Sequence, residues 1–184
     1  MERRHFLKSA CTAGLCSCAV ASLIAAEEPQ SAAPQSPPED WRIAFGRQRY
    51  AKLVSTVATR VDAATFAGIM EEVGRFCGSS GFAGKFAGDL DGFLAEAERR
   101  WQAQIEYARE HGVVRLAFAT PKGDCACPLM GKGLVPVAAC QCSVGSIRQM
   151  FTIVTRRAVQ CDLKESVLRG DGRCSFAIRL AAAA

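Results

Sequence analysis

Four cysteines in two short pairs are the residues of this 184-residue sequence best suited to chemistry. Cys125 and Cys127 are separated by one residue, as are Cys140 and Cys142, and twelve residues lie between the two pairs. A tetrahedral zinc site takes four soft ligands, and thiolates also bind Cu(I) and iron–sulfur clusters. A loop that brings the two pairs together would supply such a donor set. The spacing therefore predicts a metal or redox centre, with zinc, copper or an iron–sulfur cluster as its occupant.

Two other interpretations of these cysteines stay open at this point. In an oxidising compartment they would form disulfides, which would link one pair to the other. Alternatively, they are free thiols with a redox or binding role. Ten cysteines are present in all, and seven remain if the first 26 residues are removed, so at least one stays unpaired in a monomer. Cys77 is a candidate fifth member of the site, or else a buried residue.

The second pair also raises the possibility of a thiol-dependent enzyme. A helix is expected from Ser143, with Ser143 and Gly145 shaping its start, and the positive end of a helix lowers the pKa of a nearby thiol. Cys140 or Cys142 would then be a nucleophile, and His111 would have to be its base. We interpret His111 as a solvated surface residue instead.

Cys161 and Cys174 are interpreted as core thiols. Both lie among alternating apolar residues, and a hairpin through residues 169–172 would place Cys174 opposite Val167 and Cys161 near Leu180. That register keeps the two sulfur atoms several residue pairs apart, too far for a disulfide.

The N-terminus predicts an export signal. Arg3 and Arg4, followed by Phe6 and Leu7, resemble a twin-arginine motif, and residues 9–26 are mildly apolar. Removal of residues 1–26 would leave a protein of the periplasm or cell envelope, delivered by the export machinery and without a permanent membrane span. An uncleaved membrane anchor is the alternative.

Charge and composition restrict the partners. The formal net charge is +5, and no dense basic stripe with interleaved aromatic residues is present, so we expect no nucleic-acid partner. A small-molecule ligand is compatible with the sequence, and the oligomeric state is left open.

The remaining residues predict one α+β domain. Residues 27–39 are a Pro-rich linker, and residues 40–180 form the domain, with its motifs in residues 125–180. N-terminal helices are expected to pack on a small antiparallel sheet that carries a cysteine-rich loop. The expected helices cover residues 40–61, 62–76, 89–110 and 143–155, and the expected strands cover residues 113–119, 159–168 and 174–180.

The last third of the chain resembles the 4-vinyl reductase type small-molecule-binding domain and the related L-2-amino-thiazoline-4-carboxylate hydrolase family. The resemblance is carried by residues 140–145, Met150-Phe151, residues 159–163 and residues 165–176, which end in Gly-Asp-Gly-Arg-Cys-Ser-Phe. It implies helices packed on a small antiparallel sheet around a ligand pocket, and motif cysteines that bind metal. The helix after Cys142 lacks a histidine, and no acidic residue follows Cys142, which argues against transfer of the hydrolase activity.

Overall fold

The first two helices begin at aspartate N-caps. In the computed structural model, which describes residues 40–118 and 125–181, helix α1 spans Trp41–Ala58 and helix α2 spans Ala63–Ser80. Asp40 accepts a hydrogen bond from the backbone N–H of Arg42, and Asp62 accepts from the N–H groups of Ala64 and Thr65. The predicted signal motif (Arg3, Arg4, Phe6 and Leu7), the linker 27–39 and the loop 119–124 lie outside the described residues.

Helix α2 is longer than predicted. We expected it to end near Phe76, because Gly78 and Gly81 follow, but it continues to Ser80. The reason is tertiary: a Cβ at Gly78 would lie within 3 Å of the carbonyl oxygen of Ser146 in helix α4 (Gln141–Thr155). Gly78 therefore permits a close helix crossing and does not break the helix.

The third predicted helix is divided between a helix and a strand. After the 3-10 turn η1 (Phe82–Phe86), helix α3 covers only Leu90–Trp101, and strand β1 follows at Ala103–Ala108. The prediction of a helix to residue 110 was wrong because Gln102 adopts a left-handed conformation with φ of 49° and turns the chain. The half-buried residues of β1 alternate with exposed ones, a period of two that the flanking helical pattern obscured.

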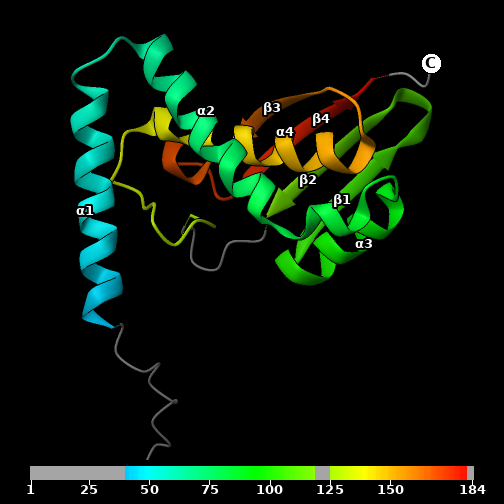
Figure 1. Cartoon of the computed structure of the whole chain (residues 1–184), viewed down its shortest axis with the longest axis horizontal. Helices are drawn as coiled ribbons and strands as arrows, with labels where there is room; N and C mark the ends of the chain where they lie inside the picture. The colour runs from blue at the N-terminus through cyan, green and yellow to red at the C-terminus, as the bar shows by residue number, and fades with distance from the viewer. Residues whose placement is uncertain (1–39, 119–124, 182–184) are drawn as a thin grey trace, which may run out of the picture. The chain divides into compact units, whose positions relative to one another are not determined.

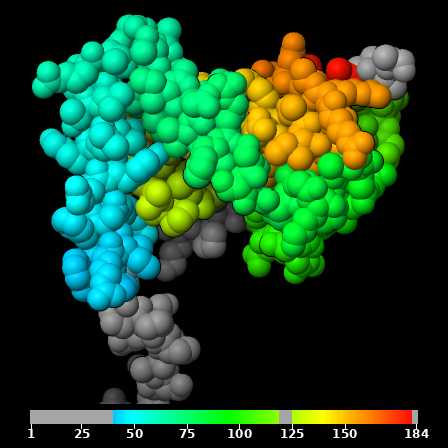
Figure 2. Space-filling model, in the orientation of Figure 1, coloured from blue at the N-terminus to red at the C-terminus, as the bar shows by residue number. Residues whose placement is uncertain are grey.

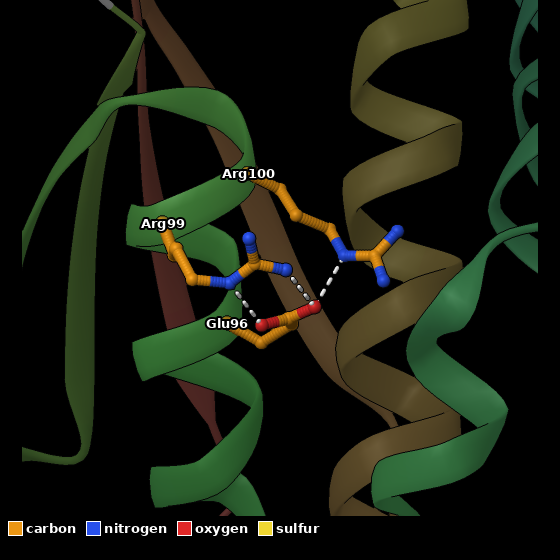
Figure 3. Close-up of polar contacts among 3 residues, drawn as sticks. All are labelled: Glu96, Arg99 and Arg100. Carbon is orange, nitrogen blue, oxygen red and sulfur yellow. Dashed lines mark hydrogen bonds and ion pairs between the residues drawn. The ribbon is translucent and has the colours of Figure 1, made fainter.

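Surface charges support α3. The Glu96 carboxylate accepts hydrogen bonds from Arg99 at 2.7 and 2.8 Å and from Arg100 (Figure 3). These bonds lower the pKa of Glu96 to about 2. The Arg100 guanidinium also lies 4.9 Å from the centre of the Phe82 ring, which connects α3 to η1.

Four antiparallel strands form one sheet in the order β1-β2-β4-β3. Strand β2 spans Val113–Phe118, β3 spans Val159–Glu165 and β4 spans Cys174–Leu180. Strand β3 ends three residues before the predicted boundary, because residues Val167–Arg169 form the 3-10 turn η5. The register also differs from our prediction: Cys161 lies opposite Ile178 rather than Leu180, and Cys174 lies opposite Phe118 on β2.

Helices α3 and α4 cover one face of the sheet. Helix α4 packs on this face, and α2 crosses over α4 (Figure 1). The main core lies between α3, α4 and the sheet and is built around large side chains from each layer. They include Phe93, Val114, Leu116, Phe151, Val154, Phe176 and Ile178. This arrangement confirms the α+β prediction. Within the part of the chain that the structure describes, no helix is long and apolar enough to span a bilayer.

A second apolar core lies away from the sheet. Buried residues of α1 and α2 meet the loop after Cys125, the 3-10 turn η4 (Val137–Cys140) and the start of α4. The members include Ala51, Val54, Phe66, Met70, Met130, Val135, Ala139 and Leu168, together with Cys140 and Cys142. The predicted cysteine site therefore belongs to this second core.

Candidate functional site

Six cysteines from different elements form the thiol cluster. Cys125 and Cys127 lie in the loop before η4, Cys140 is the N-cap of α4, and Cys142 lies in the first turn of α4. Cys77 on α2 and Cys174 at the start of β4 complete the set. In the following text "thiol cluster" means Cys77, Cys125, Cys127, Cys140, Cys142 and Cys174.

The thiols of the cluster affect one another's pKa. A charge on Cys77, Cys127, Cys125 or Cys140 raises the pKa of Cys142. A charge on Cys174 raises the pKa of both Cys125 and Cys140. The fold thus brings the two predicted pairs together and adds a thiol from α2 and one from β4.

Burial raises the pKa of three thiols of the cluster. Desolvation is the largest effect on Cys125, Cys140 and Cys142, and it raises the pKa of Cys142 to about 12. We expected the start of α4 to lower the pKa of the second pair, and this prediction was wrong. The apolar second core removes water from the sulfur atoms, and the neighbouring thiols add repulsion that disfavours a thiolate.

The Ser166 hydroxyl provides the polar contact to the cluster. Its Oγ lies 2.8 Å from the Sγ of Cys140, and it also accepts a hydrogen bond of 3.2 Å from the backbone N–H of Leu168. Ser166 is completely buried between β3 and η5. Its backbone N–H donates to Asp171 at 2.7 Å, which fixes the turn that carries the hydroxyl. The hydrogen bond from Ser166 lowers the pKa of Cys140 and so opposes the effect of burial.

The tight crossing of α2 and α4 fixes the position of Cys142. A Cβ at Gly74 would overlap the backbone carbonyl of Cys142, and one at Gly145 would overlap the carbonyl of Glu71. We expected Gly145 and Ser143 to shape the helix start, but α4 begins at Gln141 directly after η4, and Ser143 provides no cap. Gly145 instead allows the backbone of α2 to approach. An ion pair between Arg148 of α4 and Glu71 of α2 closes the same crossing.

Helix α1 encloses the cluster from the other side. Tyr50 is half-buried against the second core, and burial together with charges on Cys142, Cys127 and Cys77 raises the pKa of its hydroxyl to about 12. Arg47 donates a hydrogen bond of 2.6 Å from its Nε to the carbonyl oxygen of Pro128 and so joins α1 to the cysteine loop. The phenol of Tyr50 is therefore a further polar group at the thiol cluster.

The described residues do not form a metal site with three or more ligands. Nowhere in residues 40–118 and 125–181 do three or more His, Cys, Asp or Glu side chains converge on one ion position. Likewise, the seven cysteines of these ranges are all unbridged. The donor chemistry of four thiols fits a soft metal ion, whereas the described sulfur atoms do not meet at one ion position.

Other residues singled out from the sequence lie elsewhere. His111 is exposed in the turn between β1 and β2, at the end of the sheet opposite to Cys174. Five residues of strand, about 17 Å at 3.3 Å per residue, separate the two ends. His111 is therefore a surface residue and not a partner of the thiols. Cys161 is buried in the main core, as predicted, with Arg148 and Glu71 as its charged neighbours.

Three residues at the site were missed by sequence reasoning: Tyr50, Ser166 and Cys174. Cys174 was correctly predicted to be buried, but its closeness to Cys125 and Cys140 depends on the register of β4. Ser166 had one detectable signal, since it precedes an apolar pair and a Gly-Asp-Gly turn and could be expected to cap that turn. No sequence spacing connects Tyr50 with the cysteines.

Comparisons with known proteins identify the fold class. No family model matches the chain, and no similar curated protein was found. Among solved structures, the chain is similar to a trafficking protein particle complex subunit 3 from Naegleria fowleri, which was crystallised covalently bound to palmitic acid. The TM-score is 0.52 at 17% sequence identity, and the match covers 78% of this chain and 98% of that one. This likeness places the chain in the same fold class.

Proposed function

We propose that this chain is an exported binding protein whose thiol cluster holds a thiophilic metal ion or a small ligand. The observation that carries the proposal is that Cys125, Cys127, Cys140 and Cys142, from two separate segments, all belong to or pack against one apolar core. Export is inferred from Arg3 and Arg4. The resemblance to the 4-vinyl reductase type domain supports a ligand-binding role and stays a prediction.

The raised pKa values of Cys125, Cys140 and Cys142 mean that a bound metal ion must displace protons from these thiols. A soft ion such as Zn²⁺ or Cu(I) stabilises thiolates and so displaces their protons on binding. Because the pKa values of Cys125, Cys140 and Cys142 are raised, each site thiol that binds metal near neutral pH releases a proton. Ser166 would then donate its hydrogen bond to the Cys140 thiolate, as outer hydrogen bonds to metal ligands commonly do.

Metal analysis tests this proposal. Full-length protein purified without oxygen should contain about one equivalent of zinc, copper or iron, and Cys140→Ser with Cys142→Ser should lose it. Cys161→Ala is the matched control, because this thiol is buried in the main core outside the cluster, and it should keep the metal. Metal-free protein that takes up neither zinc nor Cu(I) under reducing conditions would contradict metal binding. The small ligand would then be the remaining occupant of the thiol cluster.

A thiol-dependent enzyme is the less favoured alternative. It needs a base near an accessible thiolate, whereas burial raises the pKa of Cys140 and Cys142, and His111 lies at the far end of the sheet. Rapid alkylation of Cys142 near neutral pH would favour this alternative.

A disulfide-stapled structural domain is the third interpretation. Thiol titration of protein denatured without reductant would support it by detecting a single free thiol.

A covalently held apolar ligand is a second candidate for the same cluster. The similar trafficking subunit was crystallised covalently bound to palmitic acid. In this chain, Cys140 and Cys142 are buried among apolar side chains, an environment that suits an acyl chain on a thioester. Intact mass before and after neutral hydroxylamine distinguishes the candidates, because only a thioester adduct is removed by this treatment.

A further inference from the structure

Helix α1 carries an unusual combination of residues on its outer side. Trp41 and Leu53 are 69% and 61% exposed, and Phe45 is exposed as well. The inner side of the same helix is occupied by Tyr50, Ala51 and Val54 in the second core. Figure 2 shows α1 with α2 and the cysteine loop along one side and no other described segment along its outer side. The helix therefore keeps a large apolar surface in water.

The charge of α1 is entirely positive. Its 18 residues include Arg42, Arg47, Arg49 and Lys52 and contain no aspartate or glutamate. The neighbouring α2 and α3, in contrast, contain residues of both signs. Arg47 is engaged with the cysteine loop, and the other three cations are exposed, with Arg42 also 3.7 Å from the carboxylate of the cap residue Asp40.

Two of the exposed cations contact exposed aromatic rings. The Arg42 guanidinium lies 5.7 Å from the centre of the Trp41 ring, and that of Arg49 lies 5.5 Å from the Phe45 ring. Each of these two guanidinium groups therefore lies beside an exposed aromatic ring. Such a surface suits a partner that has negative groups directly above an apolar layer.

We propose that the outer side of α1 docks on the surface of an anionic phospholipid bilayer. Lipid phosphates would meet Arg42, Arg49 and Lys52, while Trp41 and Phe45 enter the boundary between headgroups and acyl chains. Long basic side chains can extend to the phosphate level while their stems stay against apolar groups. A second copy of the chain fits less well, because two facing α1 helices would bring like charges together.

Fluorescence of Trp41 tests the docking directly. The chain has two tryptophans, and Trp101 packs against Phe82, Phe93 and Phe118, so the full-length Trp101→Phe variant leaves Trp41 as the reporter. We expect a blue shift of the emission on addition of vesicles of equal parts phosphatidylglycerol and phosphatidylcholine. Vesicles of phosphatidylcholine alone should give little shift, and added salt should reverse it.

Flotation with the same vesicles supplies the variant test. The pair Arg49→Glu with Lys52→Glu should lower partition to the anionic vesicles about tenfold or more. The matched charge control is Arg75→Glu with Arg99→Glu, two exposed arginines outside α1. For the apolar part, Phe45→Ala should weaken flotation, whereas Phe76→Ala, an exposed phenylalanine on α2, should not. All variants keep residues 1–39, so that segment cannot account for differences among them.

Several outcomes would overturn the docking proposal. They are an unshifted Trp41 emission with anionic vesicles, equal flotation of the α1 charge variant and its control, and self-association that buries Trp41 without lipid. Capture of an acidic protein in place of lipid would also reject it.

Discussion

At the residue scale, one hydroxyl connects the thiol cluster to the sheet. Ser166 is the buried polar residue of the described chain, and its Oγ contacts both the Sγ of Cys140 and the backbone N–H of Leu168. A buried donor that loses its partner is costly, since water does not replace it. The contact therefore affects stability as well as the state of Cys140.

Removal of this hydroxyl should destabilise the fold. We expect Ser166→Ala to lower the free energy of unfolding by about 1–3 kcal/mol, because the N–H of Leu168 is left buried without its acceptor. Urea denaturation measures the change. Ser175→Ala serves as the control, since Ser175 bonds to Glu165 on the open face of the sheet and should cost less. Equal effects of the two variants would show that the Ser166 contact has no special importance.

The raised pKa of Cys142 predicts how stability depends on pH. An unfolded thiol ionises near pH 8.5, whereas folded Cys142 does so at about 12. Below the first value both states are protonated and the contribution is complete. Above it the unfolded state loses protons first, so the free energy of unfolding of metal-free protein falls as pH rises toward 12.

Chemical denaturation at a series of alkaline pH values tests this dependence. Cys142→Ala should show a shallower decline than the wild type, because the thiol with the raised folded pKa has been removed. An unchanged slope in Cys142→Ala would mean that Cys142 ionises alike in both states.

At the scale of elements, the crossing of α2 and α4 is the contact that positions Cys142. Gly74 and Gly145 each face the backbone of the other helix with no room for a Cβ. The two helices therefore approach more closely than side chains normally allow. This close approach brings Cys77 on α2 near Cys142 on α4.

A methyl group at the crossing should force the helices apart. We expect Gly74→Ala to destabilise the protein by about 1–3 kcal/mol or more, the cost of overpacking, and to speed alkylation of Cys142. Gly68→Ala on the same helix is a matched control, because a Cβ there meets nothing within 4 Å. That control should be neutral or stabilising by up to about 1 kcal/mol through helix propensity. Thermal unfolding of both variants measures this difference. Similar melting temperatures of the two variants would contradict the tight helix crossing at Gly74.

At the scale of the whole described unit, two apolar cores stabilise different parts of the fold. The main core holds the sheet, α3 and α4, and the second core joins α1, α2 and the cysteine loop around the thiols. Cys140 and Cys142 belong to the second core and Cys161 to the main one. Access of an alkylating reagent to Cys140 and Cys142 should therefore depend on the second core, and access to Cys161 on the main core.

Truncation of one core should expose only its own thiols. Val54→Ala, in the second core, should speed alkylation of Cys140 and Cys142 and leave Cys161 protected. Val114→Ala, in the main core, should expose Cys161 more than the second-core thiols. Mass spectrometry of labelled peptides measures both. A uniform rise in labelling at all three cysteines would show that the two cores open together.

The sequence by itself determined the local features. Apolar periodicity predicted α1 and α2, alternation predicted β2, and Cys-x-Cys spacing selected thiols that the second core contains. Each of these rests on interactions within a few residues, which spacing alone reveals.

Only the tertiary structure decided the rest. It continued α2 through Gly78, turned the chain at Gln102 into β1, and brought Tyr50, Ser166 and Cys174 to the cluster. It also reversed the expected pKa shift of Cys142, because the local effect of a helix start is weaker than desolvation by an entire apolar core. Close packing and burial depend on segments distant in the chain, and spacing along one sequence does not encode which segments will meet.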